Sequence, residues 1–83
     1  MMPTETKNLI VGFPLYDGVN MMDFAGASEV FADTLGLFTP IWLAAEKREI
    51  RTSSENSVYP NYSFTDNYPP IDILFIPGVV YYK

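Results

Sequence analysis

The stretch YDGVNMMDFAG (Tyr16–Gly26) decides the fold of this chain. Residues 8–13 before it form an apolar run of strand length, and residues 27–35 after it carry apolar side chains at helical spacing. The stretch therefore predicts a turn from a strand into a helix, and ligands of α/β proteins gather at the carboxyl ends of strands. Asp23 stands in this turn among two methionines and a phenylalanine, which we expect to limit its contact with water. A carboxylate in such surroundings needs a partner, so Asp23 is the first candidate for a functional residue.

The composition is that of one small globular domain. Of the 83 residues, 48% are hydrophobic and 16% aromatic, which argues against disorder. The net charge of −5 attracts neither nucleic acid nor an anionic membrane, so we expect no such partner for this segment. The first residues lack the apolar region of a signal peptide, and no apolar run is long enough to span a bilayer. We therefore predict a cytoplasmic protein.

Several kinds of chemistry have no support in these residues. The chain contains no cysteine and no histidine, so it offers no thiol nucleophile and no imidazole base. The spacing of Asp17, Asp23 and Glu29 matches no calcium loop, and we expect no metal site. The loop after the first strand has neither Gly-x-Gly-x-x-Gly nor a Walker sequence, and we expect no cofactor.

The first half of the chain predicts a βαβ unit with parallel strands. Strands are expected at residues 8–15 and 38–45, because both runs are apolar on both faces, as in a covered parallel sheet. Between them, Asn20 is a candidate cap for a helix that reaches about Leu35 and ends at Gly36. The predicted packing stripe of this helix comprises Phe24, Ala27, Val30, Phe31 and Thr34-Leu35.

The second half predicts a short hairpin and one more strand. Residues 50–52 and 58–59 favour a hairpin, although residues 44–50 are also compatible with a helix. Residues 71–76 form a third run of the buried parallel type, which Pro77-Gly78 closes. Aromatic side chains are assigned to the core or to covering the hairpin and sheet edge, namely Trp42, Tyr59, Tyr62, Phe64 and Tyr68.

Three segments together resemble the amino-terminal part of the DJ-1/PfpI superfamily, which is class I glutamine amidotransferase-like. They are residues 11–19, residues 22–31 with the pattern Asp-Phe-Ala-Gly-x-x-Glu-Val-Phe, and residues 68–78 with Asp-x-Leu-x-Ile-Pro-Gly. The branches that they resemble most are isonitrile hydratase and the ligand-sensing domains of AraC-type transcription regulators. The resemblance implies a flavodoxin-like α/β sandwich with three layers and a parallel sheet. Residues 1–83 are then the amino-terminal portion of a single domain, and we expect a homodimer for the complete protein.

The resemblance also implies roles for particular residues. Asp23 matches the aspartate that faces a cysteine on a nucleophile elbow, where it exchanges a proton with the substrate or hydrogen-bonds the thiolate. Gly78 matches the segment that shapes the oxyanion side of the site, and Gly26 is assigned with it to substrate binding. Val79 stands where the family has a second glycine, and Ala27 stands where the branch has proline. From the residues alone, Asp23 is more often a first-turn acid of a helix than a catalyst.

The implied activity is addition of water to an isonitrile, which gives an N-substituted formamide. The substrate or ligand is then a small molecule. The nucleophilic cysteine is missing from these 83 residues, so we expect the chain itself to be inactive. Two alternatives stay open at this point: a ligand-sensing domain of an AraC-type regulator, and a truncated chain without activity.

Overall fold

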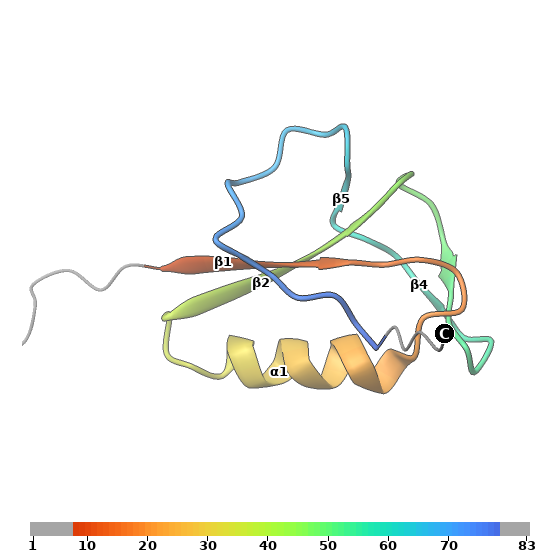
Figure 1. Ribbon diagram of the computed structural model, residues 1–83, viewed down its shortest axis with the longest axis horizontal. Helices are drawn as coiled ribbons and strands as arrows, with labels where there is room; N and C mark the ends of the chain where they lie inside the picture. Colours follow the sequence, from red (N-terminus) through yellow and green to blue (C-terminus); the bar gives the residue numbers. More distant parts are fainter. Residues whose placement is uncertain (1–7, 79–83) are drawn as a thin grey trace, which may run out of the picture.

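The computed structural model describes residues 8–78, which form a four-stranded sheet with a helical segment on one face (Figure 1). The strands of this sheet are β1 (Leu9–Pro14), β2 (Phe38–Ala44), β5 (Tyr62–Ser63) and β6 (Ile73–Leu74). The helical segment consists of η1 (Met22–Gly26), a turn of π-helix, and α1 (Ala27–Ala32). A separate antiparallel hairpin is made by β3 (Ile50–Arg51) and β4 (Ser57–Val58).

The sheet has the order β5-β2-β1-β6, and all its pairings are parallel. β1 pairs with β2 from Leu9 opposite Phe38 to Pro14 opposite Leu43, so the predicted βαβ unit is present. β6 then lies on the other side of β1. The predicted α/β class with a parallel sheet is therefore confirmed.

The core lies between the sheet and the helical segment. Alternate side chains of β1 point to this face, and Val11 and Phe13 are completely buried. The Phe13 ring lies 5.0 Å from Phe75, measured between centroids, and 6.1 Å from Phe31 of α1. Trp42 packs edge-on against Phe24 at 4.9 Å, so its predicted place in the core is correct. These aromatic contacts join β1, β2 and the residue that follows β6 to the helical segment.

The helix ends earlier than the sequence pattern predicts. α1 stops at Ala32, whereas the prediction extended the helix to about Leu35. The Thr34 hydroxyl donates to the Phe31 carbonyl at 2.6 Å and accepts from the Phe38 N–H at 3.1 Å. This side chain therefore takes up a carbonyl that would otherwise continue the helix. Leu35 and Gly36 follow with positive φ angles of 54° and 87°, which reverse the chain toward β2.

Two members of the predicted packing stripe do not face the sheet. Val30 is 69% exposed and Leu35 is 99% exposed. Successive residues of an α-helix are turned by about 100° around its axis, so Val30 is directed away from the sheet when Phe31 packs on it. Leu35 lies beyond the end of α1. The face that packs on the sheet is made instead by Phe24, Ser28 and Phe31.

The hairpin is present as predicted, and residues 44–50 do not form the alternative helix. Beyond the hairpin, the short strand β5 pairs with β2 through Leu43 opposite Tyr62, a pairing that the sequence did not predict. The Tyr62 and Tyr68 rings lie 6.1 Å apart at this side of the sheet. Tyr59 and Phe64, by contrast, are about half exposed.

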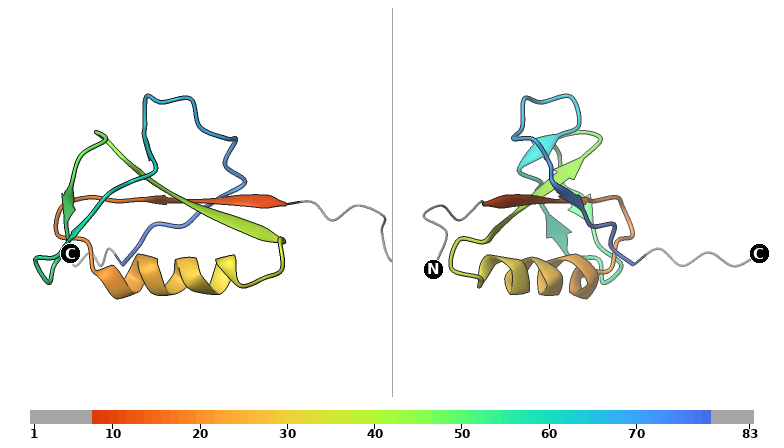
Figure 2. Two further views of the ribbon diagram at one scale, coloured as in Figure 1. Left: turned by 180° about the vertical axis from the view of Figure 1, so that it is seen from behind. Right: turned by 60° about the vertical axis from the view of Figure 1, so that its left-hand side comes forward.

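The last strand is shorter and more exposed than predicted. Pairing with β1 is limited to two positions, Val11 opposite Ile73 and Gly12 opposite Leu74. Leu74 is 59% exposed and lies on the face opposite the helix, because Phe75 next to it contacts Phe13. The helical segment covers only the other face (Figure 1), and among residues 8–78 no strand pairs with the outer side of β6, so the prediction of a buried strand is wrong. Both further views show the helical segment lying along one face of the sheet, beneath β1 (Figure 2).

Candidate functional site

The carboxyl ends of β1 and β6 meet at one edge of the sheet. β1 is followed by a connection to β2 on one side, while β6 lies on the other side of β1. Ligands of open α/β sheets bind at such a reversal of strand order, outside the carboxyl ends of the strands. The segment after β1 leads there into η1, and the segment after β6 leads there to Gly78.

Asp23 reaches this edge because Asn20 starts the helical segment beside it. The Asn20 side-chain oxygen accepts the Met22 N–H at 2.9 Å, and its backbone carbonyl accepts the Asp23 N–H at 3.0 Å. The predicted cap is therefore confirmed. The turn that follows, Met22–Gly26, is a π-helical turn, a distortion that is frequent at functional sites.

The Asp23 carboxyl lies directly against Gly78. Gly78 has a φ of +32°, and a Cβ built there would overlap the Asp23 carboxyl oxygen and lie 2.6 Å from its Cγ. Only glycine allows this approach, since any larger residue would displace the carboxyl. Two of the three residues that the sequence assigned to the site are thus brought into contact, although they come from opposite ends of the chain.

Gly26 lies on the same helical turn but shows no comparable constraint. Its φ of −63° is helical, and a Cβ at this position would meet no atom within 4 Å. The backbone there requires no glycine, so its assigned role in substrate binding stays a prediction. Val79, which follows Gly78, lies outside the described residues.

Asp23 is half-buried at this edge of the sheet. Its neighbour Phe24 is completely buried in the core, whereas Met22 is 78% exposed. Consecutive side chains of a helix point in different directions, so residues that flank Asp23 in the sequence need not lie beside it in space. None of the hydrogen bonds or ion pairs formed between residues 8–78 involves the Asp23 carboxyl.

Tyr16 is a site residue that the sequence pattern did not identify. Its hydroxyl donates to the Pro77 carbonyl at 2.9 Å and so connects the turn after β1 to the segment after β6. Pro77 is buried, and the Tyr16 ring is 38% exposed. The sequence offers little reason to single out Tyr16, because a tyrosine at the end of a strand belongs to no motif. Its partner is a backbone carbonyl that only the tertiary structure brings near.

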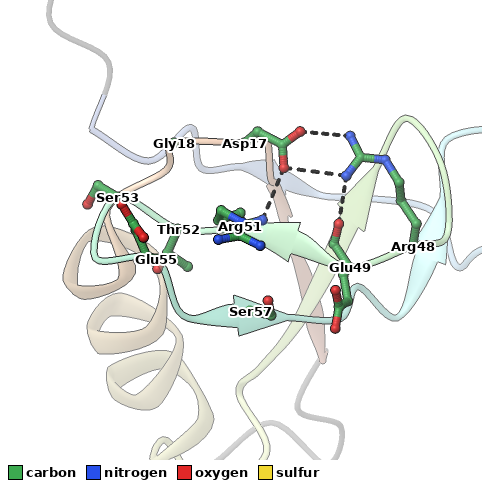
Figure 3. A pocket seen from close by; sticks show the side chains of 9 residues that line it. All are labelled: Asp17, Gly18, Arg48, Glu49, Arg51, Thr52, Ser53, Glu55 and Ser57. Atoms are coloured by element: carbon green, nitrogen blue, oxygen red, sulfur yellow. Dashed lines mark hydrogen bonds and ion pairs between the residues drawn. The ribbon is translucent and has the colours of Figure 1, made fainter.

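A polar groove of about 650 Å³, which Asp23 does not line, lies beside the hairpin (Figure 3). It is lined by Asp17, Gly18, Arg48, Glu49, Arg51, Thr52, Ser53, Glu55 and Ser57. Asp17 accepts from the Arg48 guanidinium at 2.9 Å and from the Arg51 backbone N–H at 3.0 Å. Gly18 has a φ of +91°, so the predicted turn at Asp17-Gly18 is confirmed. The ion pair between Asp17 and Arg48 and the bond from the Arg51 backbone fasten the hairpin to this turn.

These contacts change the acidity of Asp17. The hydrogen bond from Arg48 and then the bond from the Arg51 backbone lower the pKa of the Asp17 carboxyl below its ordinary value. Because this pKa is lower in the folded than in the unfolded state, the contact stabilises the fold above the unfolded pKa, and the stabilisation is lost as the pH falls through the folded pKa.

Arg48→Met is expected to raise the pKa of Asp17 toward its ordinary value, since the largest cause of the shift is removed. A carboxyl carbon NMR titration measures this directly. Asp66 is an internal control, because a backbone hydrogen bond from Ser63 is the main cause that lowers its pKa. An unchanged Asp17 titration in Arg48→Met would show that the ion pair does not form in solution.

The described residues also bear on metal binding and on membrane crossing. Within residues 8–78, no three acidic side chains come together as a metal site would require. The same part of the chain holds no helix with the length and apolar character that a bilayer crossing needs.

The fold is similar to that of two solved structures. A ThiJ/PfpI family protein from Pseudomonas syringae matches with a TM-score of 0.72 and 18% sequence identity, over 88% of this chain and 30% of that chain. A DJ-1 superfamily protein from Agrobacterium tumefaciens matches with a TM-score of 0.67 and 21% identity, over 84% of this chain and 37% of that chain. No family model matches the chain, and no curated protein is similar enough in sequence to count as a relative.

These likenesses confirm the DJ-1/PfpI fold that the three sequence segments predicted. At this level of identity they concern the fold alone. The chain spans about a third of the length of the structures that it matches, so the strands and helices described above correspond to part of their fold.

Proposed function

We propose that this chain supplies the Asp23 side of a DJ-1/PfpI-type active site that adds water to isonitriles. The observation that carries the proposal is the contact between the Asp23 carboxyl and Gly78 at the reversal of strand order. A partly exposed carboxyl without a partner among residues 8–78 is suited to proton transfer. The cysteine nucleophile comes from the part of the fold outside these 83 residues.

The proposed reaction uses Asp23 as acid and then as base. A cysteine thiolate forms a bond to the isonitrile carbon, and the neutral Asp23 carboxyl gives its proton to that carbon. The resulting carboxylate takes a proton from water as the water oxygen adds to the same carbon. The carbon–sulfur bond then breaks and the thiolate leaves, which gives the imidic acid R–N=CH–OH. Transfer of its hydroxyl proton to the nitrogen, relayed by water, yields the N-substituted formamide. Isonitrile and water are the net reactants, and Asp23 ends in its starting state.

Gly78 has a separate role in this proposal. Its close approach to Asp23 leaves no space for a side chain. In the proposed reaction, the Gly78 backbone therefore borders the carbon that Asp23 protonates. A backbone N–H at such a border donates to a developing negative charge without reorganisation, which is an effective form of stabilisation.

The test compares two forms of the protein. The extended form is this chain together with the part of the fold that carries the cysteine, and it is assayed with an aromatic isonitrile while the formamide is quantified by liquid chromatography. We expect turnover by the extended form and none by the purified 83-residue chain, which has no cysteine and no histidine. Isonitrile binding without formamide production by the extended form would contradict the hydratase proposal and would favour a ligand-sensing role.

A further inference from the structure

The peptide unit between Pro77 and Gly78 is held from two directions by the segment after β1. The Tyr16 hydroxyl donates to the Pro77 carbonyl at 2.9 Å, and the Asp23 carboxyl packs against Gly78. Both contacts bring a side chain from the amino-terminal turn onto the backbone that follows β6.

The planarity of the peptide couples these two ends. In a trans peptide the carbonyl and the following N–H lie in one plane and point in opposite directions. A hydrogen bond that fixes the direction of the Pro77 carbonyl therefore also fixes the direction of the Gly78 N–H. Gly78 has no side chain to restrict its backbone torsion angles. The hydrogen bond from Tyr16 therefore supplies a restraint that the glycine itself lacks.

We propose that Tyr16 is a positioning residue of the Asp23–Gly78 site, which aims the Gly78 N–H by holding the Pro77 carbonyl. Its own backbone is firmly placed: the Leu15 N–H before it donates to Leu43 at 2.7 Å, and its carbonyl accepts the Val19 N–H at 3.0 Å. The Tyr16 hydroxyl thus fixes the orientation of the Pro77–Gly78 peptide relative to the end of β1. The geometric part of this inference stands on the contacts alone, and its kinetic consequence rests on the proposed function.

The geometric test uses two matched tyrosines. Tyr59 also donates its hydroxyl to a backbone carbonyl, that of Lys47, at 2.9 Å, but on the hairpin side of the molecule. Tyr16→Phe is expected to lower the backbone order parameter of Gly78 from about 0.85 to below about 0.6 and to change the residual dipolar coupling of its N–H. Tyr59→Phe is expected to leave both quantities unchanged. The order parameters of Val11 and Leu43 in the core report whether the rest of the fold is intact.

A merely structural role gives a different pattern. In that case Tyr16→Phe lowers the melting temperature while the order parameter and dipolar coupling of Gly78 stay as in the parent, and the inference is overturned. A change at Gly78 of equal size in Tyr59→Phe would overturn it as well.

The kinetic test is made in the extended form. Tyr16→Phe is expected to lower kcat about fivefold, the usual worth of one hydrogen bond, with little change in KM. An unchanged kcat in an active extended form would contradict the positioning role. If the extended form shows no hydratase activity, the proposed function fails, whereas the measurements on Gly78 still decide whether Tyr16 orients the peptide.

Discussion

Asp23→Asn is expected to lower the kcat of the extended form by about 100-fold or more, which is the typical contribution of general acid–base catalysis. Asparagine has nearly the shape of aspartate, but it neither gives nor accepts a proton at useful pH. Its amide still fits against Gly78, so the fold should change little. The cap of the helical segment is Asn20, which the substitution does not alter. The unfolding free energy is therefore expected to change by less than about 1 kcal/mol, the usual scale for a cap residue.

The matched control is Glu29→Gln. Glu29 is an exposed acid in the first turn of α1, on the same helical segment as Asp23. Its neutralisation changes the net charge by the same amount, and we expect kcat to stay near that of the parent. Steady-state kinetics and the denaturant midpoint are measured on both variants. Turnover near the parent value in Asp23→Asn would rule out the catalytic assignment, and a large loss of stability with preserved turnover would mark Asp23 as structural.

Gly78→Ala is expected to reduce both stability and turnover. A residue with a side chain at positive φ costs about 1–2 kcal/mol. The new methyl group would also overlap the Asp23 carboxyl, and such overpacking typically costs about 1–3 kcal/mol. To relieve this overlap, the Asp23 carboxyl must move away from its place at the sheet edge. We therefore expect the variant to be destabilised by about 2–5 kcal/mol and its kcat to fall toward that of Asp23→Asn.

Gly36→Ala separates the two contributions. Gly36 also has a positive φ, 87°, but a Cβ there would meet no atom within 4 Å. Its cost is therefore conformational only, about 1–2 kcal/mol. Chemical denaturation of both variants gives the difference, which reports the overlap with Asp23. Adding Asp23→Ala to Gly78→Ala should recover part of the lost stability, because it removes the atoms that overlap. Equal costs for Gly78→Ala and Gly36→Ala would show that the Asp23 contact does not exist in solution.

Much of the fold could be predicted from the sequence, because the signals involved act over few residues. The apolar runs of β1 and β2, the cap at Asn20 and the turn at Gly18 are each set by neighbours a few positions away. The order strand, helix, strand then leaves the parallel βαβ arrangement as the strongly preferred connection. Three separated segments were enough to indicate the DJ-1/PfpI fold, which the solved structures confirm.

Other features depended on partners that are distant in the sequence. The helix ends at Ala32 because the Thr34 hydroxyl bonds both Phe31 and the start of β2, a competition that apolar spacing does not reveal. β6 is as apolar as β1, but among the described residues it pairs on one side only and the helical segment covers only one face (Figure 1), so Leu74 is exposed. Burial is decided by what lies alongside a strand, and a local pattern contains no information on that.

The candidate site likewise combines features set by neighbouring residues with contacts between distant ones. The sequence by itself determined that Asp23 stands at the start of a helix after a strand, where capping and turn residues are local. It also placed glycine at position 78 after the last strand. Only the tertiary structure brought the Asp23 carboxyl onto Gly78 and the Tyr16 hydroxyl onto Pro77. These contacts arise because β6 pairs beside β1 in parallel, so that the ends of two strands about sixty residues apart in the chain share one edge of the sheet.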